Sequence, residues 1–448
     1  MVLTLMVVVF VLGYLAIATE HVIHIDKSAS ALITAVILWG LYSTTFDHSE
    51  SGTTTEHVVK SLDGELMHHM GEISSILFFL IGAMTMVELI DSHGGFELIT
   101  DRITTKNKRK LLWIISLITF ALSAVLDNLT TAIVMATLSR KLIHNPKDLF
   151  IFGGFIVLAA NAGGAFSPIG DVTTTMLWVG GQISTVPTLT SLFLPSVTCI
   201  LVPLCVYSFR LKGDIETNSL TEQNELFTHT KPNVTNREKA IVFYTGFALL
   251  LFVPVFKQLT HLQPFIGILF GLGVLWILTE LIHNHKDPLD RRKLSVTGVL
   301  EKIDTPSVLF FLGILLAVGA LQSAGHLQGL ANSLGSALGD KHSLFSIYTV
   351  NILLGVCSSV IDNVPIVAAA KGMYSLADYD KDSAFWQLLA FCSGTGGSAL
   401  IIGSAAGVAV MGVLRIDFGW YLKNMSLLAI LGYASGVLVY YIQHSIVG

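Results

Sequence analysis

The chain has 448 residues, of which 52% are hydrophobic and only 13% are charged. Soluble proteins carry about 25% charged residues, so this composition excludes a soluble globular protein and predicts an all-α protein that crosses a lipid bilayer many times. The net charge of −5, with no basic patch among aromatic residues, also excludes nucleic acid as a partner.

Sixteen apolar segments follow in two sets, separated by a polar stretch at 211–238 that we interpret as a cytoplasmic linker. The first segment lacks a preceding basic region and a cleavage site, so we interpret it as a membrane helix rather than a signal peptide. The first set lies at about 1–19, 29–46, 73–92, 109–126, 127–143, 149–160, 171–186 and 189–209. The second set lies at about 240–256, 264–282, 306–324, 344–361, 362–377, 385–396, 403–414 and 420–442.

The two halves of the chain repeat each other. Three motifs recur at offsets of 232 to 235 positions: LFFLIG at 77–82 as LFFLG, Asp127-Asn128 as Asp362-Asn363, and GGAFSPIG at 163–170 as GGSALIIG. We therefore predict a first repeat at 1–210 and a second at 239–448. Internal repeats with the binding site between them are the usual architecture of secondary transporters.

The distribution of basic residues predicts the topology. The stretches 93–110 and 139–148 are both basic, so both are predicted to be cytoplasmic. The segment between them, about 109–143, must then enter and leave on one face, which favours a re-entrant hairpin with its polar turn at membrane depth. The run at about 149–186 is too long for one ordinary span and is interrupted by a Gly-rich stretch, so we interpret it as a broken helix.

Each repeat is thus predicted to contain five transmembrane helices, one of them broken, and one re-entrant hairpin. Because five crossings is an odd number, the second repeat is inverted relative to the first. Its hairpin is expected at about 344–377 and its broken helix at about 385–414. Most of the 26 Lys and Arg residues then lie on the cytoplasmic side, and both termini are predicted to be external.

The hairpin turns and helix breaks are predicted to meet near the middle of the bilayer and to form an ion or proton site. Its candidate residues are Asp127, Asn128, Thr130, Thr131, Asn161, Ser167, Asp171, Thr173, Asp362, Asn363, Thr395, Ser398 and Ser404. A carboxylate at this depth costs about 2.5–3.5 kcal/mol, so an intramembrane Asp suggests a function. The other candidates are hard oxygen ligands, and no Cys or His pattern predicts a transition metal or a cofactor.

We find no deeply buried Lys or Arg partner for these acids in the sequence, so a cation or protons must neutralise them. The site then holds protons or a metal cation but not both, and exchange follows if only the neutralised site changes its exposure. The structural alternative is that Asp127, Asp171 and Asp362 cap helices, which does not exclude ion binding. The Ser and Thr hydroxyls could equally bond to their own backbone.

Several polar residues outside this set are secondary candidates. Glu72 precedes the third helix of the first repeat, Glu88 lies deeper in the same helix, and Ser359 precedes the second Asp-Asn pair. For Glu72 the alternative is a helix cap or an interfacial charge. We expect Lys371 to extend to the outer surface rather than pair with the site. All fifteen histidines fall in loops or at helix ends, where we interpret them as surface residues.

At these residues the sequence resembles the NhaD-type sodium/proton antiporters of the ion transporter superfamily. The motifs that carry the resemblance are LDNLTTA at 126–132, SPIGDVTTTMLW at 167–178, IDNVP at 361–365 and GTGGSALIIGS at 394–404. The resemblance implies a protein of the bacterial inner membrane that expels Na⁺ or Li⁺ in exchange for H⁺, without a cofactor. It also implies an elevator-type movement against a homodimeric scaffold, and Na⁺ ligands at Asp127, Asn128, Asp171, Asp362 and Asn363.

Three other functions remain as alternatives. An anion carrier of the same superfamily would export arsenite or take up dicarboxylates with Na⁺, but it would tolerate fewer buried acids. A channel has no need of duplicated inverted halves. A membrane enzyme would require a Ser/His or metal-ligand constellation, which the sequence lacks.

Overall fold

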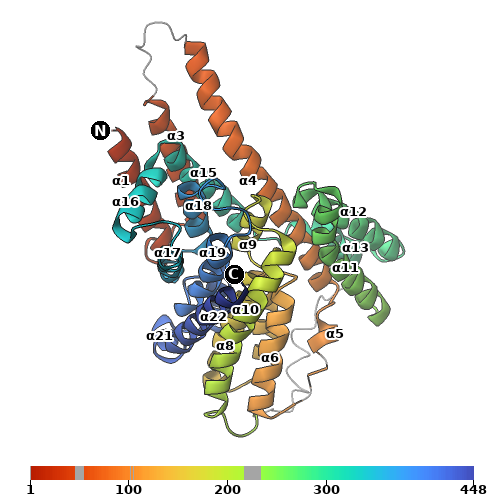
Figure 1. Ribbon diagram of the computed structural model, residues 1–448. Helices are drawn as coiled ribbons and strands as arrows, with labels where there is room; N and C mark the ends of the chain where they lie inside the picture. The colour runs from red at the N-terminus through yellow and green to blue at the C-terminus, as the bar shows by residue number, and fades with distance from the viewer. Residues whose placement is uncertain (1, 46–54, 101, 104, 216–233, 448) are drawn as a thin grey trace.

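The computed structural model describes residues 2–45, 55–100, 102–103, 105–215 and 234–447, and this part of the chain is built from helices (Figure 1). The first half contains α1 (Val2–Ala18), α2 (Glu20–Ile23), α3 (Lys27–Ser43), α4 (Thr55–Ser92), α5 (Glu97–Thr100), α6 (Lys108–Ser123), α7 (Asn128–Leu142), α8 (Pro146–Ala165), α9 (Val172–Val179) and α10 (Thr185–Ser208). The second half contains α11 (Asn236–Thr260), α12 (Pro264–His283), α13 (Pro288–Leu294), α14 (Val296–Leu300), α15 (Thr305–Ser323), α16 (His326–Leu338), α17 (Leu344–Cys357), α18 (Asn363–Met373), α19 (Ala384–Gly396), a 3-10 turn (Gly397–Ala399), α20 (Ala405–Leu414), α21 (Phe418–Asn424) and α22 (Ser426–Val447).

Seven of the described helices are long and apolar enough to cross a membrane. An eighth span exists if α20 and α21, which meet at a bend of 114°, are counted together. Three further apolar helices, α1, α3 and α17, are shorter. The prediction of an all-helical, multi-pass membrane protein is therefore confirmed.

Fifteen of the sixteen predicted apolar segments each coincide with one helix, whereas the segment at 420–442 covers parts of both α21 and α22, and the largest difference in bounds is at α4. This helix begins at Thr55 instead of near residue 73, because its first turns are too polar to register as an apolar segment. Figure 1 shows α4 between two groups of helices, with α11, α12 and α13 on one side and α3 and α15 on the other. The amphipathic α16 was not predicted. Most of the predicted linker at 211–238 lies outside the described residues.

The centre of the protein is formed by α8 and α19, which pack against each other. Every side chain from Phe152 to Ala165 in α8 is buried, as is every one from Phe385 to Gly396 in α19. A helix that is apolar and buried on all sides belongs to the interior of a bundle. Helix breaks that contain candidate site residues follow the C-terminal ends of these two helices, so they lie deep in the molecule.

Corresponding contacts recur in the two halves. Ser123, at the end of α6, donates a hydrogen bond to the carbonyl of Ala160 in α8 at 2.5 Å. Ser358, just after α17, donates to the carbonyl of Ser393 in α19 at 2.8 Å. Each hydroxyl thus joins the first arm of a predicted hairpin to the buried helix that follows it.

Two glycines allow the close approach of these helices. A Cβ atom on Gly163 in α8 would collide with the backbone carbonyl of Phe120, and one on Gly396 in α19 would collide with that of Gly355. Because the colliding atoms belong to the backbone, they cannot move aside as a flexible side chain would. The glycines therefore serve packing, as expected where helix backbones approach closely in a membrane.

Candidate functional site

The four breaks in the helices lie around one small cavity of about 50 Å³. The break between α6 and α7 contributes Asp127, Asn128 and Thr130, and α9 begins directly after Asp171. The break before α18 contributes Asp362 and Asn363. A water molecule needs about 10–15 Å³ by this measure, so the cavity has room for an ion with a few waters. The structure thus brings three predicted acidic residues to one place.

Asp171 is the centre of the hydrogen-bond network, and its side chain is 1% exposed. One carboxylate oxygen accepts the backbone N–H and the hydroxyl of Thr173, both at 2.9 Å, so Asp171 is also the N-cap of α9. The other oxygen accepts the Asn128 amide at 2.8 Å, and the Asn363 amide lies 3.3 Å from both oxygens. The Asp-Asn motifs of the two halves therefore meet on one carboxylate.

Asn161 connects the two halves of the site. Its oxygen accepts a hydrogen bond from the Asn128 amide at 3.1 Å. Its own amide donates to the hydroxyls of Ser398 and Ser404, both at 2.9 Å. Ser404 caps α20 as Asp171 caps α9, by accepting a backbone N–H of the following helix. The site is therefore asymmetric, with a carboxylate at one helix break and a hydroxyl at the other.

Asp127 has an unusual backbone conformation, with φ of 131° and ψ of 157°. This region is populated almost only by glycine and costs about 1–3 kcal/mol for other residues, and such strain concentrates at functional sites. The carboxylate accepts the backbone N–H and the hydroxyl of Thr130, both at 2.8 Å. Asp127 is thus the N-cap of α7 and lines the cavity at the same time.

Asp362 has a cationic partner that the sequence analysis, which considered deeply buried Lys and Arg residues, did not identify. The ammonium of Lys27 lies 4.0 Å from its carboxylate, and the two side chains are 26% and 16% exposed. The sequence suggested no such pair, because Lys27 lies more than 300 positions away, at the start of α3. Packing of α3 against α15 places that helix end beside the cavity.

The donor set fits a hard monovalent cation. Residues with carboxylate, hydroxyl and amide oxygens line the cavity, and hard cations prefer such ligands. In the part of the chain that the structure describes, no group of three His, Cys, Asp or Glu side chains is arranged to hold a metal by itself. An ion there would share a carboxylate with neutral oxygens, the arrangement expected at unwound helix ends in transporters.

Seven of the thirteen predicted ion-site residues do not line the cavity, and neither does the secondary candidate Ser359. Four of the seven, Asn161, Thr173, Ser398 and Ser404, belong to the hydrogen-bond network described above, whereas Thr131, Ser167 and Thr395 do not. Thr395 and Ser359 donate to backbone carbonyls of their own chain segment, at 2.6 and 2.7 Å. The Ser167 hydroxyl accepts the N–H of Ile169 at 3.4 Å within the break after α8. The hydroxyl of Thr131 is buried without a hydrogen-bond partner. For Thr395 and Ser359 the structure supports the alternative of local backbone bonding.

The secondary acidic candidates also lie elsewhere. Glu72 is about half exposed and lines a second cavity of about 300 Å³, where its carboxylate pairs with the ammonium of Lys371 at 3.5 Å. Lys371 therefore pairs with a secondary candidate that lies outside the cavity at Asp171. Glu88 pairs with Lys302 at 3.7 Å and accepts the hydroxyl of Ser92 at 3.1 Å.

The interpretation of the histidines as surface residues is wrong for two of them. His93 is 0% exposed and His283 is 2% exposed, and their Nε2 atoms lie 2.7 Å apart. The other ring nitrogen of His93 contacts the carbonyl of Leu89 at 2.6 Å. His93 follows α4 directly and His283 ends α12, so the pair joins the ends of two packed helices. Their position at helix ends was predicted, but burial by a neighbouring helix could not be.

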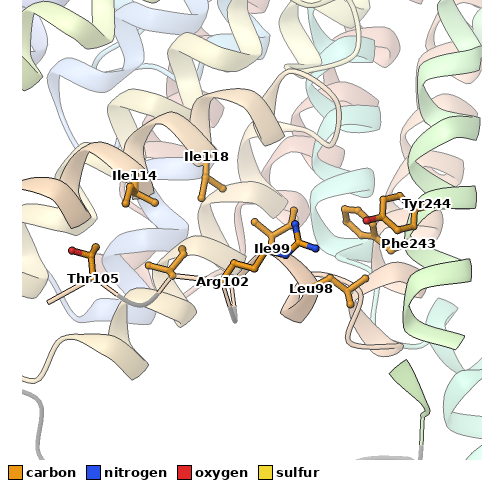
Figure 2. Close-up of a pocket in the computed structure, with 9 residues that line it drawn as sticks. Leu98, Ile99, Arg102, Thr105, Ile114, Ile118, Phe243 and Tyr244 are labelled. Carbon is orange, nitrogen blue, oxygen red and sulfur yellow. The ribbon is translucent and has the colours of Figure 1, made fainter. Parts of the chain in front are cut away.

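A larger cavity of about 330 Å³ lies between α5, α6 and α11 (Figure 2). Apolar side chains such as Ile114, Ile118 and Phe243 line most of it, and its charged lining residue is Arg102. It offers no carboxylate to a cation, and the guanidinium would repel one. The small cavity at Asp171 is therefore the better candidate for a cation site despite its size.

Acidic residues buried at helix breaks inside a multi-pass membrane protein define a transporter rather than an enzyme. Comparison with known proteins agrees. Residues 14–388 match the profile of the CitMHS family, described as "Citrate transporter". The crystal structure of the YdaH transporter from Alcanivorax borkumensis matches with a TM-score of 0.60, covering 94% of this chain and 99% of that one at 10% identity, which shows a shared fold.

Similar sequences narrow the family. Sodium/proton antiporter 1 of Arabidopsis thaliana is 47% identical over 441 residues, 98% of this chain and 72% of the relative. Sodium/proton antiporter 2 of the same plant is 44% identical, covering 98% of this chain and 99% of the relative. The Na⁺/H⁺ antiporter NhaD of Alkalimonas amylolytica is 30% identical over 93% of this chain and 84% of its own length. The chain belongs to the NhaD-type sodium/proton antiporters of the CitMHS family.

Proposed function

We propose that this protein exchanges Na⁺ for H⁺ across a membrane, with both ions competing for the carboxylates around the central cavity. One observation carries the proposal: Asp171 is buried at a helix break and is met there by the Asp-Asn motifs of both halves. The choice of Na⁺ and H⁺ as the transported ions follows the names of the similar sodium/proton antiporters described above. Li⁺, also a small hard cation, is proposed as a second substrate.

The proposed ligands are the carboxylates of Asp127, Asp171 and Asp362, with the Asn128 and Asn363 side chains. In the structure both amides donate hydrogen bonds to Asp171. Rotation of either amide would present its oxygen to a cation instead of its N–H groups. The residues of the site can thereby serve as donors to a bare carboxylate or as ligands to an ion.

Exchange follows from the energetics of moving the site. A carboxylate that has lost its ion is costly to carry through the bilayer, whereas a neutralised one is not. The site therefore moves its exposure from one membrane face to the other only when Na⁺ or protons are bound. After the site has carried Na⁺ outward, it must bind protons before it can face inward again. More than one carboxylate is available for protons, which favours electrogenic exchange.

The proposed architecture has two inverted repeats, 1–210 and 239–448, each with a re-entrant hairpin and a broken helix. The matched contacts of Ser123 and Ser358, and of Gly163 and Gly396, support a duplicated unit. The basic stretches then face the cytoplasm and both termini face outward. We further propose an elevator-type movement, a homodimeric scaffold, and a place in a bacterial inner membrane.

Proteoliposomes with an imposed pH gradient test the function. Addition of Na⁺ or Li⁺ is expected to collapse the gradient, whereas K⁺, arsenite and succinate are expected to leave it unchanged. Asp127→Asn and Asp362→Asn are each expected to abolish the Na⁺ response in folded protein. A gradient that responds to arsenite or succinate but not to Na⁺ would establish the anion carrier instead.

A further inference from the structure

We infer that Lys27 is a tethered cation that holds Asp362 when no transported ion is bound and that Na⁺ must displace it. The inference rests on the proposed function and identifies a residue that sets the affinity of the site. Lys27 belongs to none of the motifs that indicated the site. In the described part of the chain, its ammonium nevertheless forms an ion pair with Asp362, one of the acids that line the cavity.

Two contacts hold the ammonium beside the cavity. It lies 4.0 Å from the Asp362 carboxylate and 4.7 Å from the centre of the Phe310 ring. A cation within about 6 Å of an aromatic centroid is attracted by the ring. The ring provides the ammonium with a second partner, so Lys27 can leave the carboxylate and still keep a favourable contact.

The ion pair is loose enough to be exchanged. Direct hydrogen bonds between an ammonium and a carboxylate are about 2.7–2.9 Å long, and this pair is longer. In the described part of the chain, the Asp362 carboxylate accepts one hydrogen bond, from the backbone N–H of Val364 at 3.4 Å, and Tyr14 lies close enough to interact with it electrostatically. Asp362 is therefore less constrained than Asp171, which accepts hydrogen bonds of 2.8–2.9 Å from Asn128 and Thr173 and a longer one, at 3.3 Å, from Asn363.

The pair also links two helices, α3 and α18, each of which packs against α15. α3 is bound to α15 by side-chain hydrogen bonds from Ser28 to the Pro306 carbonyl at 2.7 Å and from Trp39 to the Leu316 carbonyl at 3.0 Å. Asp362 instead caps α18, beside the buried site. The pair therefore ties the start of α3 to the start of α18.

These observations give Lys27 a defined role. With the site empty, its charge offsets that of Asp362 and joins α18 to the α3–α15 pair. When Na⁺ occupies the carboxylate, the two positive charges repel and the ammonium withdraws toward Phe310. Lys27 is thus a competitor within the chain that lowers the affinity of the site for Na⁺ and assists its release.

A second pair on α18 provides the control. Near the other end of this helix, Lys371 pairs with Glu72 of α4 at 3.5 Å, also between separate helices. That pair lines a different cavity from the one that contains Asp362. Lys371→Met therefore removes an equivalent interhelical ion pair without changing the charge at the site.

The test is a Na⁺ titration of gradient collapse in proteoliposomes at one alkaline pH, with the full-length protein. Lys27→Met and Lys27→Gln are expected to lower the apparent KM for Na⁺ by about three- to tenfold, as the loss of a partly exposed competing charge implies. Vmax should not rise, because tighter binding slows release. Lys27→Arg and Lys371→Met should keep the wild-type KM.

An unchanged or higher KM in both neutral variants would overturn the inference, as would an equal fall in Lys371→Met. A merely structural lysine would lower Vmax or folded yield without tightening Na⁺ binding. The proposed function is judged separately, by the wild-type protein. A wild type without any Na⁺ response refutes that function, whereas a responding wild type with unchanged KM in the Lys27 variants refutes only the present inference.

Discussion

Asp171→Asn tests the site at the residue where its hydrogen bonds converge. The substitution keeps the size of the side chain and removes its charge. Two charges 4 Å apart interact by about 4 kcal/mol at an effective dielectric constant of 20, which corresponds to about a thousandfold in affinity. We therefore expect the apparent KM for Na⁺ to rise beyond the range that can be titrated.

The hydrogen-bond geometry adds a second effect of the same substitution. If the new amide oxygen keeps the Thr173 contacts, its NH₂ group faces the amide donor of Asn128, which lies 2.8 Å from Asp171 in the wild type. Relief requires rotation of Asn128, which breaks its bond to Asn161. An unsatisfied buried group costs about 1–3 kcal/mol, so a lower melting temperature is also expected.

The assay is Na⁺-driven collapse of a pH gradient, with the melting temperature measured on the same preparations. Thr395→Val is the matched control, because Thr395 is equally buried but bonds only to the carbonyl of Phe391 in its own helix. This variant should transport normally. Asp171→Asn protein that is folded and retains a wild-type KM would refute the assignment of Asp171 to the ion site.

Three further predictions concern stability, read from melting temperatures of the purified protein. Gly163→Ala should strongly lower the melting temperature because the new Cβ atom would meet a backbone carbonyl. Gly335→Ala should not lower it, because the space around Gly335 is open. Equal effects of the two substitutions would contradict the packing argument. His93→Ala should cost about 1–3 kcal/mol by leaving His283 without its partner, and an unchanged melting temperature would show that the pair contributes nothing. Hydrogen bonds from a lysine and a serine lower the pKa of Asp378 from 3.8 to about 2 in the folded protein. The ionised carboxylate therefore stabilises the fold fully above pH 3.8, and this stabilisation is lost as the pH falls through about 2. Asp378→Asn should accordingly destabilise the protein at neutral pH but not near pH 2.

The positions of the helices could be predicted because apolar segments and polar interruptions are local properties of the sequence. The break after α8 is one example, since Gly163, Gly164 and Pro168 all disfavour a continuous helix there. The beginning of α4 could not be predicted in the same way. Its first turns are polar, and apolar content alone does not distinguish a polar helix from a loop.

The acidic residues of the site could be predicted from their chemistry, but their partners could not. An Asp in an apolar segment is costly wherever it lies, so Asp127, Asp171 and Asp362 were conspicuous. The ion pair between Lys27 and Asp362 depends on the packing of α3 beside the cavity, which no local pattern encodes. The same holds for Asn161, whose bonds reach serines of the other half of the chain.

The central claim is that the same carboxylates hold either Na⁺ or protons, and proton release measures this directly. Purified protein in weakly buffered detergent solution is mixed with NaCl while the pH is recorded, with choline chloride as the control. We predict that Na⁺ releases protons from the wild type and that Asp171→Asn releases markedly fewer. Saturable Na⁺ binding by the wild type with no release of protons would contradict the claim.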